Sequence, residues 1–236
     1  MTSELDEKLI AAKEKWAREK RHQSGPQGDS AAVEAAAKLA ARPAPGEGPT
    51  KKRLPPGQHK TDGWPVLDLG MKPFVPLKDW SFTVTGLVET PVTWSWEDFQ
   101  AQPQVEIKAD IHCVTSWSMF NGVWGGVSAK HFLSVVKPKP EAKFLLFRSY
   151  DSYSTNVPLA RFDDDDVMLA HRWNGQPIDR DHGGPMRPII PKLYFWKSAK
   201  WVRSVAFLAE DQPGYWEVRG YHNDADPWKE ERYSGD

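Results

Sequence analysis

Cysteine is almost absent from this sequence: Cys113 is alone among 236 residues, which excludes a disulfide within the chain. The sequence also has no marked excess of positive or negative charge, because it contains 31 basic and 32 acidic residues. Nucleic-acid-binding domains are usually strongly basic, so we expect no nucleic-acid partner. No apolar run approaches the roughly 18 residues of a membrane span, and residues 1–8 lack the apolar core of a secretory signal. We therefore expect a cytoplasmic protein without a membrane span.

What the sequence does contain fits one enzyme domain with an extension. A chain of 236 residues with 39% hydrophobic content can bury a core of useful size. Residues 1–50 are expected to form a helical N-terminal arm, with an amphipathic helix over 4–21 and an Ala-rich helix over 30–42 that ends before Pro43. We expect this arm to wrap its own domain or a neighbouring subunit, so that any homo-oligomer would use it. The alternative, a membrane-binding amphipath, is disfavoured by acidic residues on the polar face.

Residues 51–236 are expected to form the enzyme domain, and strand patterns dominate it from residue 80 onward. Alternating or β-branched segments predict strands over 81–88, 105–114 and 143–149, and a short strand entering a helical turn over 92–99. Residues 128–136 predict a short helix. This irregular order favours an α+β domain with much sheet, without the regular alternation of a doubly wound fold.

Cys113 stands at the end of one of these predicted strands, where a rigid backbone would hold its thiol in a fixed orientation. A single thiolate is a soft ligand for one metal bond, and is too little to build a zinc or iron–sulfur site. If Cys113 binds a metal, a cofactor has to supply the remaining ligands. The alternative is a buried free cysteine that acts as a small hydrophobe.

A second segment, residues 182–202, has the composition of a site for a large anion. Arg187 offers a planar fork for a phosphate or a ring oxygen, and Lys197, Ser198 and Lys200 add two ammonium groups and a hydroxyl. Gly183 and Gly184 permit close backbone approach. The alternative is a surface lysine cluster beside a Gly-Gly turn.

The order of three motifs resembles the sulfite oxidase superfamily of molybdopterin enzymes, over about residues 54–225. The motifs are His112-Cys113-Val114, Asn174-Gly175-Gln176-Pro177-Ile178, and His182-Gly183-Gly184-Pro185-Met186-Arg187 followed by Lys197-Ser198-Ala199-Lys200-Trp201-Val202. The resemblance implies a largely β molybdopterin-binding domain that holds molybdenum through one pterin dithiolene and the Cys113 thiolate. It also implies transfer of an oxygen atom to or from a small-molecule substrate.

The resemblance further implies which residues bind the cofactor. His182 and Arg187 would bind the pterin, and residues 197–200 (Lys197, Ser198, Ala199, Lys200) its phosphate end. Ser149, with Arg148 beside it, matches a pterin contact after the strand over 143–149, although turn chemistry alone would explain the loop that follows. Gln58 and His59 match the entry segment that lies against the cofactor in the family.

Two departures from the sulfite-oxidising members bear on the substrate. Those members carry an arginine five residues after the ligand cysteine, where this chain has Ser118, and a tyrosine where this chain has His171. A tight sulfite pocket is therefore not expected, and His171 becomes the candidate proton donor at the metal. The run from Cys113 to Met119 looks closer to the methionine-sulfoxide-reducing branch, but that branch is exported, so its substrate is not carried over.

The sequence contains no haem motif, and the family's second, sandwich-like domain is missing, so we expect electrons to come from a separate electron-transfer protein. The run Asp163 to Asp166 is expected to be a solvated turn leading into a helix rather than a metal site. A cofactor-binding or structural homologue without turnover remains the alternative to an active oxidoreductase.

Overall fold

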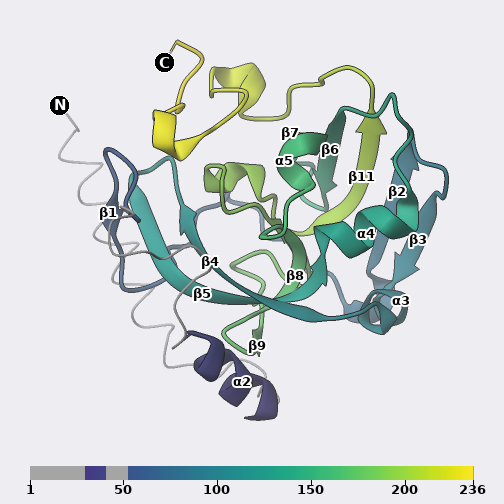
Figure 1. Ribbon diagram of the computed structural model, residues 1–236, viewed down its shortest axis with the longest axis horizontal. Helices are drawn as coiled ribbons and strands as arrows, with labels where there is room; N and C mark the ends of the chain where they lie inside the picture. The colour runs from purple at the N-terminus through teal and green to yellow at the C-terminus, as the bar shows by residue number, and fades with distance from the viewer. Residues whose placement is uncertain (1–29, 41–52, 236) are drawn as a thin grey trace.

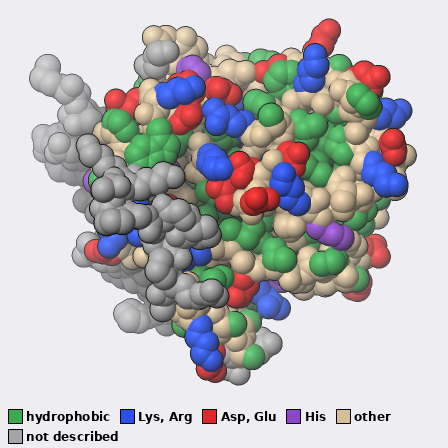
Figure 2. Space-filling view, in the orientation of Figure 1, with side chains coloured by type: hydrophobic (Ala, Val, Ile, Leu, Met, Phe, Trp, Pro, Cys, Tyr) green, Lys and Arg blue, Asp and Glu red, His purple; other side chains and the backbone are tan. Residues whose placement is uncertain are grey.

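The computed structural model describes residues 30–40 and 53–235, which form two β-sheets with short helices around them (Figure 1). The long β4–β5 pair sweeps across the molecule, and the second sheet stands at one side of it in that view. On the face shown in Figure 2, acidic and basic side chains lie interspersed rather than gathered by sign.

The first sheet is organised around β5, which runs from Trp117 to Ser128. β4 pairs antiparallel along one edge of β5, while β1 (parallel) and β8 (antiparallel) pair with its two ends; β9 and β10 extend β8. The bounds of these partners are β1 His59–Lys60, β4 Val105–His112, β8 Met168–Trp173, β9 Gln176–Pro177 and β10 Arg187–Ile189.

The second sheet has five strands in the order β3-β2-β11-β6-β7. Its strands are β2 Ser81–Gly86, β3 Val92–Ser95, β6 Phe144–Ser149, β7 Ser154–Pro158 and β11 Val202–Leu208. β2 and β11 pair in parallel, whereas the other pairs are antiparallel. The parallel pair joins segments about 120 residues apart, so the sheet forms only when distant parts of the domain meet.

The helices are short, and side-chain caps explain where two of them begin. α3, Trp96–Ala101, has a capping box in which Ser95 and Asp98 each accept from the other's backbone N–H. α4, Ala129–Val136, begins after Ser128, whose hydroxyl accepts from the His131 amide at 3.2 Å. The remaining helices are α2 Ser30–Ala40, α5 Leu159–Phe162 and the 3₁₀ turns η1 Leu77–Asp79, η2 Phe195–Lys197, η3 Glu217–Arg219 and η4 Pro227–Lys229.

The interior is divided into a main hydrophobic core and a second cluster beside the first sheet. The main core contains Phe82, Phe132 and Phe207, none of which is exposed. The second cluster contains Cys113 together with Ile111, Trp124, Met168 and Ile189. Cys113 is therefore set in an apolar surrounding at the end of β4.

The structure confirms an α+β fold rich in sheet. The strands expected over 81–88, 105–114 and 143–149 correspond to β2, β4 and β6, and the helix expected over 128–136 is α4. The short strand entering a helical turn that was expected over 92–99 corresponds to β3 followed by α3. α2 fits the helix expected over 30–42 as far as residue 40, whereas the helix expected over 4–21 lies outside the described residues. The expectation for Asp163 to Asp166 needs a correction, because this turn follows α5 and leads into strand β8.

α2 is the described part of the N-terminal arm, and it lies against β4 and β5. A Cβ atom added at Gly175 would lie 2.5 Å from the Cα atom of Val33, so only glycine allows this approach at the turn after β8. Among the described residues, no helix is long and apolar enough to cross a membrane.

Candidate cofactor site

A cavity of about 360 Å³ opens beside Cys113, and its walls come from segments far apart in the sequence. Its lining residues lie within the segments 64–69, 113–117, 151–153 and 195–201, without Lys197, and Arg187, Trp216 and Tyr221 complete the lining. Eight of the twenty lining residues are aromatic: Trp64, Trp117, Tyr153, Phe195, Trp196, Trp201, Trp216 and Tyr221. A concave, mostly apolar space with a few polar groups is the usual form of a cofactor site.

Cys113 contributes the thiol in this wall, and the loop after β4 holds it there. Its backbone N–H donates to the Trp117 carbonyl at 2.9 Å, and Ser116 closes the turn with a φ of 72°. The sulfur lies 3.2 Å from the Thr115 hydroxyl. Burial raises the pKa of the thiol, although the Thr115 hydrogen bond opposes that shift. A thiol in this setting becomes a thiolate when a metal replaces its proton.

Arg187 places a buried positive charge in the same wall. Its Nη1 donates to the His182 carbonyl at 2.7 Å and its Nη2 to the Ser198 carbonyl, while its buried Nε has no partner among the described residues. The guanidinium lies 4.2 Å from the Phe195 ring centre. Burial lowers the pKa of Arg187 to about 9, and the charges that oppose this are Tyr153 and Cys113 rather than a carboxylate.

Lys200 adds a second cation to the wall. The side chain of Lys200 occupies space that the absence of a side chain at Gly183 leaves open. Its Nζ donates to the Asp181 carbonyl at 2.6 Å, and burial lowers its pKa to about 7, with Arg187 adding to the shift. A Cβ at Gly183, where φ is 101°, would lie 2.7 Å from the Cβ of Lys200. Ser198 and Ala199 line the same cavity.

These features fit a large anionic cofactor. Arg187 is buried and makes no ion pair with a carboxylate among the described residues, whereas Lys200 is half-buried and lies near the carboxylates of Asp68 and Asp181. A bound anion would offset the desolvation penalty of the Arg187 guanidinium. The unpartnered Arg187 Nε supplies a donor, and the aromatic walls accommodate a flat ring system. The structure thus brings Cys113, Arg187, Ser198, Ala199 and Lys200 together around one space.

Three other predicted residues lie just behind this wall. His182 does not line the cavity, but it contacts Trp64, which does. The His182 Nε2 atom lies 3.0 Å from the Trp64 carbonyl, and the centres of the two rings are 4.2 Å apart. Gln58 donates from Nε2 to the Cys113 carbonyl at 3.1 Å. The side chain of His59 is exposed, and its backbone N–H donates to the Ser116 carbonyl at 2.8 Å. Gln58 and His182 thus hold residues that line the cavity, whereas His59 holds Ser116 in the turn after Cys113.

Lys197 is directed away from the cavity. Its side chain is fully buried, its Nζ lies 2.7 Å from Glu217 Oε1, and it donates to the Asn156 backbone and side-chain oxygens at 3.0 Å each. Its ammonium is therefore engaged within the protein, so we do not retain Lys197 as a phosphate contact.

Arg148 and Ser149 lie on β6, outside the residues that line the cavity. The Ser149 hydroxyl is buried and has no partner among the described residues, so its proposed cofactor contact stays a prediction. The loop after β6 instead brings Asp151 and Tyr153 to the cavity.

His171 also lies away from the cavity, on the opposite face of β8. Met168 and Ala170 pack in the cluster that contains Cys113, whereas Leu169 packs in the main core. Alternation along the strand therefore turns His171 toward α3, where its Nδ1 lies 3.4 Å from Gln100 Nε2 and its ring meets Phe99 edge-on. Burial lowers its pKa to about 4. The expectation that His171 lies beside the metal therefore does not agree with the direction of its side chain on β8.

His171→Phe is accordingly expected to leave turnover nearly unchanged and to alter the acid stability of the protein. The folded-state pKa of about 4 lies below the unfolded value of about 6.5, so the unfolded chain binds the proton first. The contribution of the neutral His171 side chain to the free energy of unfolding is therefore present above pH 6.5 and is lost as the pH falls toward 4. Urea unfolding at pH 7 and pH 4.5 measures the free energy of unfolding at each pH. This free energy should fall less between pH 7 and pH 4.5 in the variant than in the wild type. A tenfold slower turnover in His171→Phe would instead restore its catalytic role.

Several wall residues were not predicted from the sequence. Trp64, Tyr153 and Tyr221 reach the cavity from segments with no recognisable local motif. Arg232 donates to the Val114 carbonyl across more than a hundred residues. Only the tertiary structure brings such groups together, although the density of aromatic residues around the motifs was a weak signal.

Comparisons with known proteins agree with the geometry. Residues 70–216 match the family model of the oxidoreductase molybdopterin-binding domain. The oxidoreductase YuiH of Bacillus subtilis (strain 168) is 42% identical over 185 residues, which cover 78% of this chain and 93% of YuiH. A putative protein-methionine-sulfoxide reductase subunit, YedZ1 of Azospira oryzae, is 31% identical over 59% of this chain and 53% of its own length.

More distant matches cover smaller parts of longer proteins. Sulfite oxidase of Arabidopsis thaliana is 27% identical over 61% of this chain and 46% of its own length. In fold, the chain is similar to the sulfane dehydrogenase SoxCD of Paracoccus pantotrophus, with a TM-score of 0.53 at 24% identity, over 59% of this chain and 40% of that one. The chain spans about half or less of these longer relatives. It belongs to the family of oxidoreductase molybdopterin-binding domains of the sulfite oxidase type, whose cofactor is molybdopterin with its molybdenum.

Proposed function

We propose that this protein is a molybdenum-pterin oxidoreductase that transfers an oxygen atom to or from a small substrate, with Cys113 as the protein's metal ligand. The observation that supports this most is the position of the chain's single cysteine in the wall that also carries Arg187 and Lys200. When bound, the molybdenum centre supplies the two-electron chemistry of oxygen-atom transfer.

The protein's own residues bind and orient the cofactor in this proposal. Arg187 and Lys200 bind its anionic groups, and Ser198 and Ala199 offer polar backbone between them. Gln58 holds the Cys113 carbonyl, and His182 holds Trp64 in the wall. The aromatic side chains exclude water, which strengthens each electrostatic contact inside the cavity.

Sulfite is not the expected substrate in this proposal, because the position where sulfite-oxidising members carry an arginine holds the buried Ser118. Ser118 is fully buried, its hydroxyl donates to Gln58 Oε1 at 3.2 Å, and it lies 2.8 Å from His112 Nδ1. No cation is supplied from that position to hold a sulfite dianion. We further propose a separate electron-transfer protein as partner, a cytoplasmic location, and the N-terminal arm as the surface for any homo-oligomer.

The experiment that tests the function is quantification of molybdenum and pterin in protein purified from a host that makes the cofactor. Near-stoichiometric amounts of both, with turnover in a dye-linked assay, are expected. Sulfite should support only slow turnover with weak saturation, and efficient oxidation at micromolar sulfite would contradict the substrate argument. Bound cofactor without turnover on sulfite, sulfoxides or N-oxides would favour the alternative, a cofactor-binding homologue. Protein without molybdenum or pterin would favour a purely structural homologue.

A further inference from the structure

The loop that carries Cys113 is fixed by side chains from two distant parts of the chain. Gln58 Nε2 donates to the Cys113 carbonyl at 3.1 Å, and Arg232 Nη1 donates to the Val114 carbonyl. Inside the loop, the Ser116 N–H donates to the Cys113 carbonyl at 3.0 Å. Consecutive carbonyl groups in the loop are thus held from outside it, one by a segment that precedes β1 and one by a segment that follows η4.

Arg232 is well placed for this contact because its guanidinium is packed on several sides. It lies 5.1 Å from the ring centre of Tyr194, and its Nη2 is 3.5 Å from the Pro56 carbonyl. Gly57 leaves the space beside it, since a Cβ there would lie 3.1 Å from Nη2 and 2.8 Å from Glu230 Oε1. A planar guanidinium group that contacts two carbonyl groups and the face of a ring has little freedom to move.

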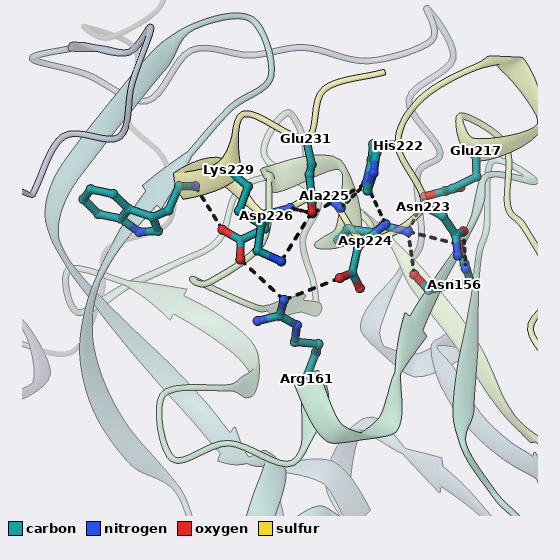
Figure 3. Close-up of polar contacts among 12 residues, drawn as sticks. Asn156, Arg161, Glu217, His222, Asn223, Asp224, Ala225, Asp226, Lys229 and Glu231 are labelled. Atoms are coloured by element: carbon teal, nitrogen blue, oxygen red, sulfur yellow. Dashed lines mark hydrogen bonds and ion pairs between the residues drawn. The ribbon is translucent and has the colours of Figure 1, made fainter. Parts of the chain in front are cut away.

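The segment that delivers Arg232 is anchored independently of it. Glu217 pairs with buried Lys197 at 2.7 Å, and Figure 3 shows Arg161 reaching toward the carboxylates of Asp224 and Asp226, at 3.5 and 3.4 Å. Asn156 donates to Asn223 Oδ1 at 2.8 Å in the same view. We therefore expect residues 217–226 to remain docked when the Arg232 contact alone is removed.

We propose that Arg232 is a positioning residue for Cys113: by fixing the Val114 carbonyl, it holds the loop in the conformation that directs the thiol into the cavity. The family match ends at residue 216, so this contact comes from beyond the matched domain. The consequence for metal ligation rests on the proposed function, whereas the fixing of the loop is testable without cofactor.

The test is hydrogen exchange, measured by mass spectrometry, on the full chain prepared without cofactor. Arg232→Met keeps an unbranched apolar stem close in length to the aliphatic part of the arginine and removes the donors. The amides of Cys113 and Ser116 should then exchange on the order of tenfold faster, as expected when a charged hydrogen bond is lost. Arg232→Lys, which keeps one cationic donor, should recover much of the protection. Lys229→Met is the matched control, because its side chain is 60% exposed and lies in the same segment.

The location of the change distinguishes positioning from a merely structural role. Faster exchange confined to the loop, with the amides of His222 and Ser234 still protected, supports the proposal; these two donate to Arg232 and Gly220 carbonyls in the delivering segment. Unchanged loop exchange, or faster exchange at His222 and Ser234 as well, overturns it. If the wild-type protein binds no molybdenum but the loop still loosens in Arg232→Met, the proposed function fails while the positioning role stands.

Discussion

Cys113→Ser is expected to abolish molybdenum-centred turnover while the fold and most of the bound pterin remain. A serine hydroxyl has nearly the shape of the thiol but is a poor soft ligand for the metal. Since Cys113 is the only cysteine in the sequence, no other thiol can replace it. The pterin contacts that we propose for Arg187, Ser198 and Lys200 are untouched by the substitution. Dye-linked turnover, pterin content and circular dichroism measure the three quantities.

Thr115→Val is a useful companion, because it removes the hydroxyl 3.2 Å from the sulfur and leaves the thiol in place. This variant is expected to retain molybdenum. Wild-type turnover in Cys113→Ser would show that the ligand assignment is wrong. Loss of pterin together with activity would instead show that the thiolate anchors the whole cofactor.

Lys197→Met is expected to have the largest effect on stability. It leaves the Glu217 carboxylate, whose side chain is 1% exposed, without its cation. The hydrogen bonds from Thr155 and Trp196 to Glu217 Oε1 remain, but Oε2 has no partner among the described residues. Removing one member of a buried ion pair typically costs about 3–5 kcal/mol. For a domain of this size, that corresponds to a melting temperature lower by roughly 10 °C.

Lys192→Met provides the matched control in thermal unfolding. Lys192 pairs with Asp164 at 2.5 Å, but its side chain is 52% exposed, so its removal should cost only about 0–1 kcal/mol. The double variant Lys197→Met with Glu217→Gln should recover part of the loss, because it removes the unpaired buried charge. Equal small losses in both lysine variants would show that the Lys197–Glu217 pair contributes little net stability.

Local sequence signals were sufficient for the elements that carry the site. The β-branched pattern before Cys113 predicted β4 and its end, and Ser128 before an apolar run predicted the start of α4. These predictions succeeded because strand alternation and helix caps depend on neighbouring residues only. Arg187, Ser198 and Lys200 come from one short stretch of chain and line one cavity, while their contacts with a cofactor stay predictions.

Side-chain direction could not be predicted in the same way. His171 and Ala170 are adjacent in β8 but lie on opposite faces of the strand, and the register of the strand in the sheet decides which of them packs in the cluster that contains Cys113. Lys197 and Lys200 are three residues apart, yet the turn at η2 sends one to Glu217 and the other to the cavity. Trp64 reaches the site through contacts that no local pattern encodes.

The distribution of the cavity wall along the chain fixes the order of events during biosynthesis. The wall begins at Trp64 and is completed by Trp216 and Tyr221, so a growing chain on the ribosome has no closed cavity until these last wall residues have emerged. Cofactor insertion consequently follows synthesis of the domain, and nascent chains halted before residue 216 would be unable to retain the cofactor.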